Sequence, residues 1–125
     1  MEEAGGRLMY RVKNRTKYNV GKRETREHNG VYYDSKLEAG YAAKLDILVN
    51  GGAIKSWRRQ VTVPLTAYGK QICTYRVDFE ITHNDGHIEF VEVKGFETPV
   101  WRIKWKLFEA MMNAERPDIE LTVVR

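Results

Sequence analysis

The spacing of apolar and polar residues along the chain predicts two helices separated by strands. After an Asn-Gly turn, residues 31–33 have the composition of a short strand. Apolar residues then recur at helical spacing from Asp34 or Ser35 to the glycines that follow Asn50. We expect this helix to end where Gly51 supplies the left-handed conformation.

Three strands are predicted after this helix, over residues 53–65, 71–82 and 88–94. The second of them alternates strictly and therefore presents two chemically different faces. Its apolar face is formed by Tyr75, Val77, Phe79 and Ile81, and its polar face by Arg76, Asp78 and Glu80. The third strand has apolar residues at both parities, which is typical of a central strand covered on both sides.

A second helix is predicted to begin at Pro99, with Thr98 as its N-cap, and to run to about Glu115. The last strand covers residues 119–124. From residue 30 on, the order is therefore strand, helix, three strands, helix and strand. This order predicts an α/β (α+β) fold in which a central mixed sheet is flanked by helices.

The second helix carries two apolar stripes, and only one of them is expected to face the core. That stripe consists of Val100, Ile103, Leu107, Met111 and Ala114. The other consists of Trp101, Trp105 and Met112. We expect this second stripe to be covered by another segment of the chain, with base stacking or a dimer contact as the alternatives.

At 125 residues the chain should form one domain, residues 30–125, preceded by an arm over residues 1–29. No apolar run approaches the ~18 to 20 residues that span a bilayer, and the N-terminal stretch lacks the apolar centre of a signal peptide. The single cysteine, Cys73, cannot form an internal disulfide and fits a small buried apolar role. A cytoplasmic protein without membrane contact is therefore predicted.

The net charge of +4 is concentrated in residues 1–33, whose eight bases and four acids account for all of it. A basic arm with interleaved tyrosines suits a polyanion, because each neutralised phosphate releases counterions. Candidate phosphate contacts in this arm are Arg15, Lys17, Lys22 and Arg23. The alternative is a solvated N-terminal segment without a partner.

The stretch FVEVKG, residues 90–95, places Glu92 and Lys94 on one side of an otherwise apolar strand. One interpretation is an ion pair on the outer surface of a sheet. The other includes Asp78: if the preceding turn is a three-residue loop with Gly86 in the left-handed position, Asp78 lies directly opposite Glu92. Opposed carboxylates ~4.5 to 5.5 Å apart at Cβ repel unless a cation lies between them.

Two acids and an amine on neighbouring central strands suit a hard divalent cation with a phosphate bound to it. Glu38 is a candidate third acid, because helical spacing places it on the core-facing stripe of the first helix. Glu38 also fits the S-x-x-E capping box that starts at Ser35, and the two uses can coexist.

An Asp followed by Glu-x-Lys on paired strands resembles the PD-(D/E)xK nuclease superfamily, whose core order of helix, three strands, helix and strand matches the predicted elements. Val77 stands where that motif has proline. The stretch YDSKLEAG…Q…VDF…VEVKGFETPVWRIKWKLFEA is also similar to uncharacterised phage proteins placed in this superfamily. A helix-borne Glu ahead of the Asp and Glu-x-Lys is the arrangement of Holliday-junction resolvases. The resemblance therefore implies a restriction-endonuclease-like fold and favours branched DNA as the substrate, in the host-cell cytoplasm if the protein is phage-encoded.

The same resemblance implies a Mg²⁺-dependent endodeoxyribonuclease, with Mn²⁺ able to substitute, that leaves 5′-phosphate and 3′-hydroxyl ends. The expected ligands are Asp78, Glu92, Glu38 and the main-chain carbonyl of Val93. Lys94 would orient the attacking water and stabilise charge on the phosphate. Gln60 matches a glutamine often found near such sites, where it either lines the pocket or pairs with the backbone. A homodimer without a small-molecule cofactor is expected, since resolvases commonly act as symmetric dimers.

The second helix offers further contacts to DNA. Thr98 and the first helical amides form a natural phosphate site, and Arg102, Lys104 and Lys106 add positive charge near it. Lys104 lies near the expected core stripe and is predicted to reach back toward the active phosphate.

His28, His83 and His87 have no spacing that suggests a zinc site, so we expect surface residues beside turns. Three alternatives to a junction nuclease stay open: a nuclease for ordinary duplex or DNA ends, a non-catalytic DNA-binding module on a nuclease fold, and an interaction protein whose arm binds RNA or an acidic partner. A binding module has no use for opposed carboxylates facing a phosphate, because they would repel it. This argument favours an enzyme.

Overall fold

A computed structural model describes residues 22–125 and shows a mixed α+β protein with two long helices and a four-stranded sheet. The elements in chain order are η2 (Arg23–Arg26), β1 (Glu27–His28), β2 (Val31–Tyr32), α1 (Lys36–Asn50), β3 (Ser56–Ala67), β4 (Lys70–Thr82), β5 (Ile88–Val93), α2 (Pro99–Glu115) and β6 (Glu120–Val124). Residues 22–29 of the expected arm thus include η2 and β1, both of which contact α1.

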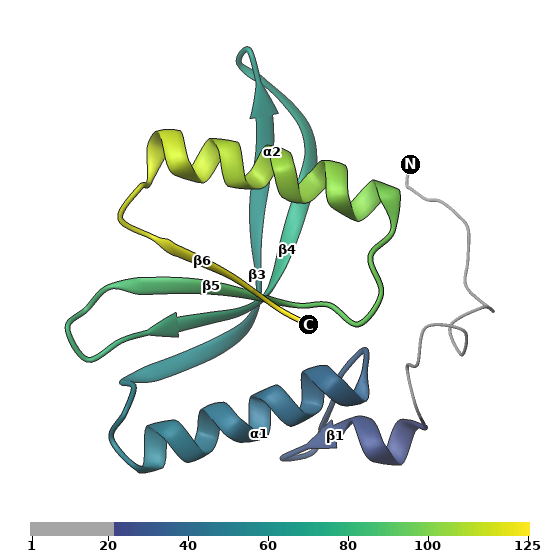
Figure 1. Ribbon diagram of the computed structural model, residues 1–125, viewed down its shortest axis with the longest axis vertical. Helices are drawn as coiled ribbons and strands as arrows, with labels where there is room; N and C mark the ends of the chain where they lie inside the picture. The colour runs from purple at the N-terminus through teal and green to yellow at the C-terminus, as the bar shows by residue number, and fades with distance from the viewer. Residues whose placement is uncertain (1–21) are drawn as a thin grey trace.

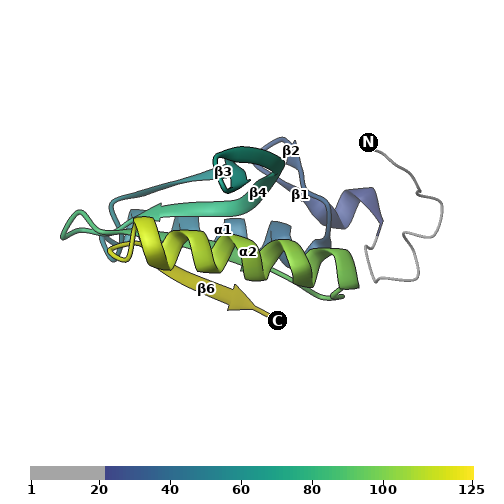
Figure 2. The same cartoon turned by 90° about the horizontal axis from the view of Figure 1, so that it is seen from above.

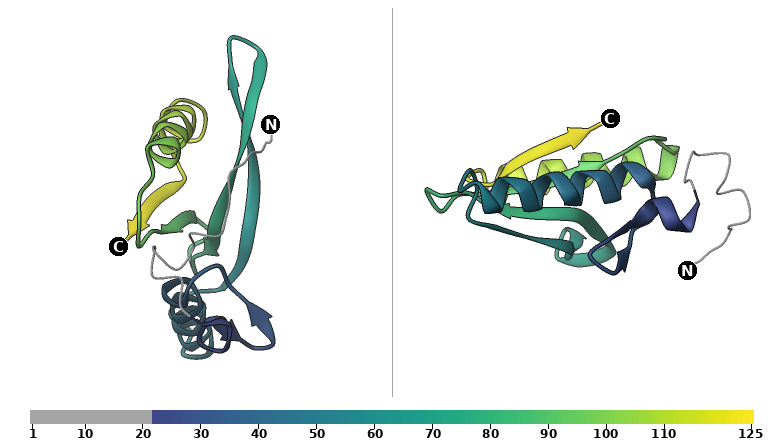
Figure 3. Two further views of the ribbon diagram at one scale, coloured as in Figure 1. Left: turned by 90° about the vertical axis from the view of Figure 1, so that its right-hand side faces the viewer. Right: turned by 90° about the horizontal axis from the view of Figure 1, so that it is seen from below.

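The main sheet has the strand order β3-β4-β5-β6 and is mixed, as predicted. Its first three strands form an antiparallel meander, and β6 pairs in parallel with β5. Figure 1 and the left panel of Figure 3 show α1 and α2 on opposite sides of β5 and β6. Seen from above, β6 lies on the far side of the molecule from the β3–β4 hairpin (Figure 2). Neither helix of the described part is long and apolar enough to cross a membrane.

The helix ends follow the predicted caps with one correction. The Ser35 hydroxyl accepts from the Glu38 amide at 3.0 Å, and the Thr98 hydroxyl accepts from the Trp101 amide at 3.0 Å. At the end of α1 the left-handed residue is Gly52, with φ +78°, whereas Gly51 stays helical at φ −85°. The Gly51 amide bonds to the Ile47 carbonyl at 2.9 Å, so α1 ends at Asn50 as predicted and only the left-handed glycine lies one residue later.

The hairpin between β4 and β5 has the predicted register. Phe79 pairs with Val91, and the His83 amide donates to the His87 carbonyl at 2.9 Å across the turn. Gly86 has φ +94°, the left-handed conformation that a three-residue hairpin loop requires.

The expected core face of α2 is only partly correct, because Leu107 and Met111 pack against the core but the rest of the stripe does not. Val100 and Ile103 have exposed fractions of 65% and 70%, whereas Trp101, Phe108 and Met112 are buried. The aromatic face buries more apolar area per residue, and its rings pack against aromatic residues of the sheet. The tryptophan stripe is therefore largely covered by the sheet, as we expected: Trp101 and Met112 are buried, and Trp105 is half-buried against Tyr75.

Strand β4 serves two separate cores. Phe79 packs under α1 with Leu45 and Val91, whereas Val77, two residues earlier, packs under α2 with Phe108. Between them the pairing of β3 with β4 skips from Arg59–Phe79 to Val61–Val77. The skipped residue of β3 is Gln60, which has φ +57°, and by register its partner is Asp78. Figure 3 shows the hairpin running from α1 past α2. The left-handed Gln60 interrupts the pairing of its strands between the two cores, beside Asp78.

The tip of the β3–β4 hairpin projects beyond α2 (Figure 1) and is built on Tyr68 and Gly69, with φ of +52° and +80°. A tight turn with two positive φ values favours Asn-Gly, and a bulky residue at its first position is strained. Tyr68 is fully exposed, so no packing compensates for this strain. We expect Tyr68→Asn to raise the free energy of unfolding by ~0.5 to 1 kcal/mol in urea titrations. Tyr68→Ala is the control; an equal gain there would show that removal of the ring, not relief of the backbone, stabilises.

Candidate active site

A pocket of about 250 Å³ opens where β4 and β5 stop pairing. It is lined by Asp34, Ser35, Glu38, Asp78, Val93, Lys94, Gly95, Phe96 and Thr98. These residues come from the start of α1, the bend of β4, the end of β5 and the loop before α2. The fold thus brings Glu38, Asp78, Lys94 and Thr98 together from segments far apart in the sequence.

Asp78 ends the pairing between the two central strands. The last paired residues are Phe79 and Val91, and beyond them an Asp78 Oδ2 accepts from the Val93 amide at 2.8 Å. A side chain therefore replaces the backbone as hydrogen-bond partner, and the strands separate at this point. Burial raises the pKa of the Asp78 carboxyl, while the Val93 amide and Lys94 oppose that shift.

Glu92 has an exposed fraction of 3% and lies next to the pocket without lining it, between the lining residues of β4 and β5. Burial, followed by the negative charge of Asp78, raises the pKa of Glu92 to about 7. Its Oε2 lies 3.5 Å from Lys94 Nζ, and its Oε1 is buried without a hydrogen-bond partner. A surface ion pair is therefore excluded for Glu92, because its carboxylate is inside the protein.

Glu38 points into the protein from the first turn of α1, as predicted, and only 4% of it is exposed. Its amide takes part in the cap through Ser35, yet its Oε2 is buried and unpartnered. Burial, then the charges of Asp78 and Asp34, raise the pKa of Glu38 to about 8, and Arg59 lowers it. An inward carboxylate with a free oxygen is an expensive feature unless something binds to it.

The donor set suits a hard divalent cation. Glu38 and Glu92 are buried and Asp78 is half-buried. The charge of Asp78 raises the pKa values of both glutamates, and each glutamate has an oxygen without a partner. Carboxylate and carbonyl oxygens are the ligands preferred by Mg²⁺ and Mn²⁺. Within residues 22–125, however, the three acids do not bring their oxygens within 4.8 Å of one another as a group. An ion shared by all three therefore requires a side-chain rotation or a bridging water.

Two aromatic residues that the sequence patterns did not mark as functional support these groups. Trp101 Nε1 donates to the Tyr75 hydroxyl at 2.8 Å, and Tyr75 in turn hydrogen-bonds Glu92 and lowers the pKa of Glu92. Lys94 Nζ lies 5.3 Å from the centre of the Trp101 ring. Tyr75 and Trp101 thus hold both Glu92 and Lys94 in place from the α2 side.

Two charged residues at the site were also missed. Asp34 lines the pocket just before the N-cap of α1. An acid at this position is common because it interacts favourably with the helix dipole, so the sequence offers no reason to assign it to a site. Arg59 stacks on the Tyr33 ring at 4.2 Å, and its charge lowers the pKa of Glu38. Its position on an alternating strand gives no sign of this role, because the bend at Gln60 is not visible in the pattern.

The candidate DNA contacts of α2 are only partly gathered at the pocket. Thr98 lines it, whereas Arg102 lies 3.6 Å from Glu97 and is exposed. Lys104 is half-buried and Lys106 is exposed, and neither is among the lining residues. The same is true of Gln60, although its register places it beside Asp78.

The remaining candidates belong to the arm. Lys22 is exposed, and Arg23 lies over the Tyr32 ring at 4.1 Å. Arg15 and Lys17 lie outside the described residues.

Comparison with known proteins identifies one family. A family model described as "Protein of unknown function (DUF1064)" matches residues 15–125. A search of the curated proteins found no match. A search of the solved structures found none either. The match covers the candidate site entirely.

Proposed function

The chain belongs to the DUF1064 family, proteins of unknown function, and from the site that its fold assembles we propose that it is a metal-dependent endodeoxyribonuclease. The observation that carries this proposal is a pair of buried acids, Glu38 and Glu92, each with a free oxygen, grouped with the half-buried Asp78 near Lys94. Uncompensated buried carboxylates cost stability, and a divalent cation is the partner that offsets this cost.

The fold supports the proposal at the level of topology. After α1, an antiparallel meander of β3, β4 and β5 leads into α2, and β6 returns in parallel beside β5. Asp78 and Glu92 lie where β4 and β5 separate. Glu38 faces this point from α1. We propose that this arrangement is the restriction-endonuclease-like core of the PD-(D/E)xK superfamily that the sequence resembles.

Each residue of the site has a chemical role in this proposal. Asp78, Glu92 and the Val93 carbonyl would hold Mg²⁺ or Mn²⁺, with Glu38 joining directly or through water. A bound ion would supply an acidified water and positive charge at the phosphate. Lys94 holds its ammonium beside Glu92, where it can orient that water and stabilise charge developing on the phosphate oxygens. Thr98 and the positive end of the α2 dipole offer a phosphate site at the pocket rim, although Pro99 has no N–H and the Trp101 amide is bonded to the Thr98 hydroxyl.

Branched DNA is the proposed substrate, because a helix-borne Glu joined to Asp and Glu-x-Lys is the resolvase arrangement. The proposed enzyme is a cytoplasmic homodimer, since a four-way junction offers two equivalent strands. A nuclease for ordinary duplex DNA uses the same site and differs only in how DNA reaches it.

The test is cleavage of matched four-way junction, splayed-arm and linear duplex DNA with Mg²⁺ or Mn²⁺. We expect symmetric nicks near the branch point and at least ~10-fold slower cleavage of linear duplex, a ratio that corresponds to about 1.4 kcal/mol. Equal cleavage of all three would eliminate junction selectivity but keep the nuclease. Binding without a nick in any substrate, with either metal, would show a non-catalytic module.

A further inference from the structure

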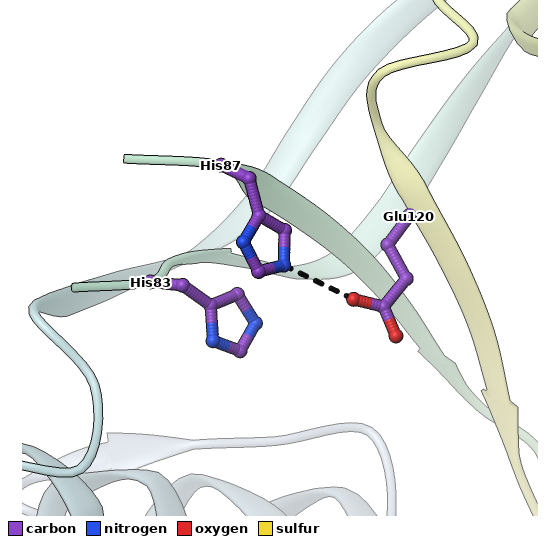
Figure 4. A group of neighbouring side chains, drawn as sticks. All are labelled: His83, His87 and Glu120. Carbon is purple, nitrogen blue, oxygen red and sulfur yellow. Dashed lines mark hydrogen bonds and ion pairs between the residues drawn. The ribbon is translucent and has the colours of Figure 1, made fainter. Parts of the chain in front are cut away.

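A second cluster of metal-ligand residues lies at the end of the sheet away from the acidic pocket. His83 follows β4, His87 precedes β5, and Glu120 begins β6. One ligand atom from each lies within 4.8 Å of the others. Figure 4 shows the two imidazole rings side by side, with His87 Nε2 directed at Glu120 Oε1, 3.2 Å away. His83 and His87 are separated by three residues, a spacing that also occurs in zinc sites, so the expectation from the sequence underrated this pair. The third residue, Glu120, is distant in the sequence and is brought beside them by the parallel strand β6.

The ring of His87 is already oriented for a ligand. An Asp85 Oδ1 lies 2.6 Å from His87 Nδ1 and also accepts from the His87 amide at 3.0 Å. This contact fixes the ring and leaves Nε2 facing Glu120. A carboxylate bound to the far nitrogen of a histidine is the usual support of metal-binding imidazoles.

The ring of His83 is held by a second carboxylate. His83 Nε2 lies 2.8 Å from Glu89 Oε1, and the other oxygen of Glu89 accepts from the Thr122 hydroxyl at 2.6 Å. Glu89 is buried, so it is fixed beside the cluster and available as a further oxygen donor.

We propose that His83, His87 and Glu120 bind a borderline transition-metal ion, Zn²⁺ in the first place, as a staple between the β4–β5 hairpin and β6. Two imidazoles and one carboxylate are a donor set that Zn²⁺ accepts, with water or Glu89 as a fourth ligand. The same set is poor for Mg²⁺, which prefers oxygen ligands. Five residues of extended strand, ~16 Å, separate His83 from Asp78, so this site is distinct from the proposed catalytic one.

Binding requires one rearrangement. The two rings are stacked, with centroids 4.1 Å apart and planes 5° from parallel. An imidazole nitrogen binds a metal in the plane of its ring, and two stacked planes cannot contain the same ion. The His83 ring must therefore rotate out of the stack, which breaks its hydrogen bond to Glu89 so that a ring nitrogen can bind the ion. The His87 ring can keep its hydrogen bond to Asp85. His83 is only half-buried, beside an exposed turn, which leaves it room to turn.

Thermal unfolding and calorimetry of the tag-free full chain with ZnCl₂ test this proposal. We expect one Zn²⁺ per chain at this site and a rise in Tm of at least ~5 °C at saturating metal. His87→Ala and Glu120→Gln should each lower the affinity at least ~10-fold. His28→Ala is the matched control, because His28 lies in a different cluster with Asp46. The double variant Asp78→Asn/Glu92→Gln should still bind Zn²⁺, which separates this site from the acidic pocket.

A second measurement on the unmodified chain does not depend on whether the variants fold. In ¹⁵N NMR of the imidazoles, Zn²⁺ should shift the Nε2 signal of His87 and a ring nitrogen of His83, while the His28 signals stay unchanged. The proposal is overturned if Zn²⁺ shifts neither ring, or if His87→Ala and Glu120→Gln bind Zn²⁺ as tightly as the unmodified chain. Either result would identify the group as a purely hydrogen-bonded cluster.

Discussion

Replacing Lys94 with alanine is expected to slow DNA cleavage by at least ~100-fold while changing DNA affinity by less than about threefold. Lys94 is half-buried, lines the pocket, and holds its ammonium 3.5 Å from Glu92. A charge at this depth contributes little to the capture of DNA, which depends on cations spread over the surface. It contributes most when charge develops on a phosphate in the pocket.

A second variant tests the negative charge of Asp78 separately from its structural hydrogen bond. Asp78→Asn keeps an oxygen that can accept from the Val93 amide, so the separation of the strands should persist. The negative charge that would hold a cation is lost, and we expect a similar or larger decrease in cleavage. Single-turnover cleavage gives the rates, and fluorescence anisotropy with Ca²⁺ gives the affinities.

The matched control for Lys94→Ala is Lys55→Ala. Lys55 is exposed, is not a lining residue of the pocket, and its amide bonds to the carbonyl of Thr82, four residues beyond Asp78 in β4. Its removal subtracts the same charge without touching the acids. If Lys94→Ala and Lys55→Ala cleave at the same rate, Lys94 has no part in the chemistry and the proposed mechanism fails.

The position of these groups follows from local rules that leave little freedom. Gly86 fixes the length of the hairpin loop, the loop fixes the register, and the register places Asp78 opposite Glu92. Glu38 is equally constrained, because a helix that starts at Ser35 must turn it toward the sheet. The three acids could therefore be predicted from the sequence, each from a periodicity of two or 3.6 residues.

The surroundings of the acids depend on tertiary contacts and could not be predicted in this way. The α2 helix has two apolar stripes, and contacts with the sheet determine which of them is buried. Tyr75 of β4 hydrogen-bonds Trp101 and stacks on Phe108, so the aromatic stripe faces the sheet. The bend at Gln60 arises from a left-handed backbone that no pattern of apolar residues encodes. Arg59 meets Tyr33 and Tyr75 meets Glu92 through tertiary contacts, which strand alternation does not reveal.

The metal-free protein is expected to lose stability as pH rises, and Glu38→Gln should remove much of that loss. The pKa of Glu38 is about 8 in the folded chain and about 4.5 in the unfolded one. Between these values the folded state holds a proton that the unfolded state releases, so rising pH favours unfolding. The stability contributed by neutral Glu38 is complete below about pH 4.5 and lost by about pH 8. Glu92, with its pKa raised to about 7, adds to the same trend over a narrower range.

Urea unfolding with EDTA at pH 5 and pH 8 measures this effect. At pH 8 we expect Glu38→Gln to be more stable than the unmodified chain by roughly 2 to 4 kcal/mol, and at pH 5 the two should be nearly equal. Glu109→Gln, on the exposed face of α2, is the control and should change neither value. Added Mg²⁺ should then stabilise the unmodified chain at pH 8 and stabilise Glu38→Gln less, because the ion and the proton compete for the same oxygens. The contrary result is a metal-free Glu38→Gln that is less stable than the unmodified chain at pH 8. It would show that the protein itself stabilises the ionised Glu38 carboxylate. There would then be no reason to place a cation at this carboxylate.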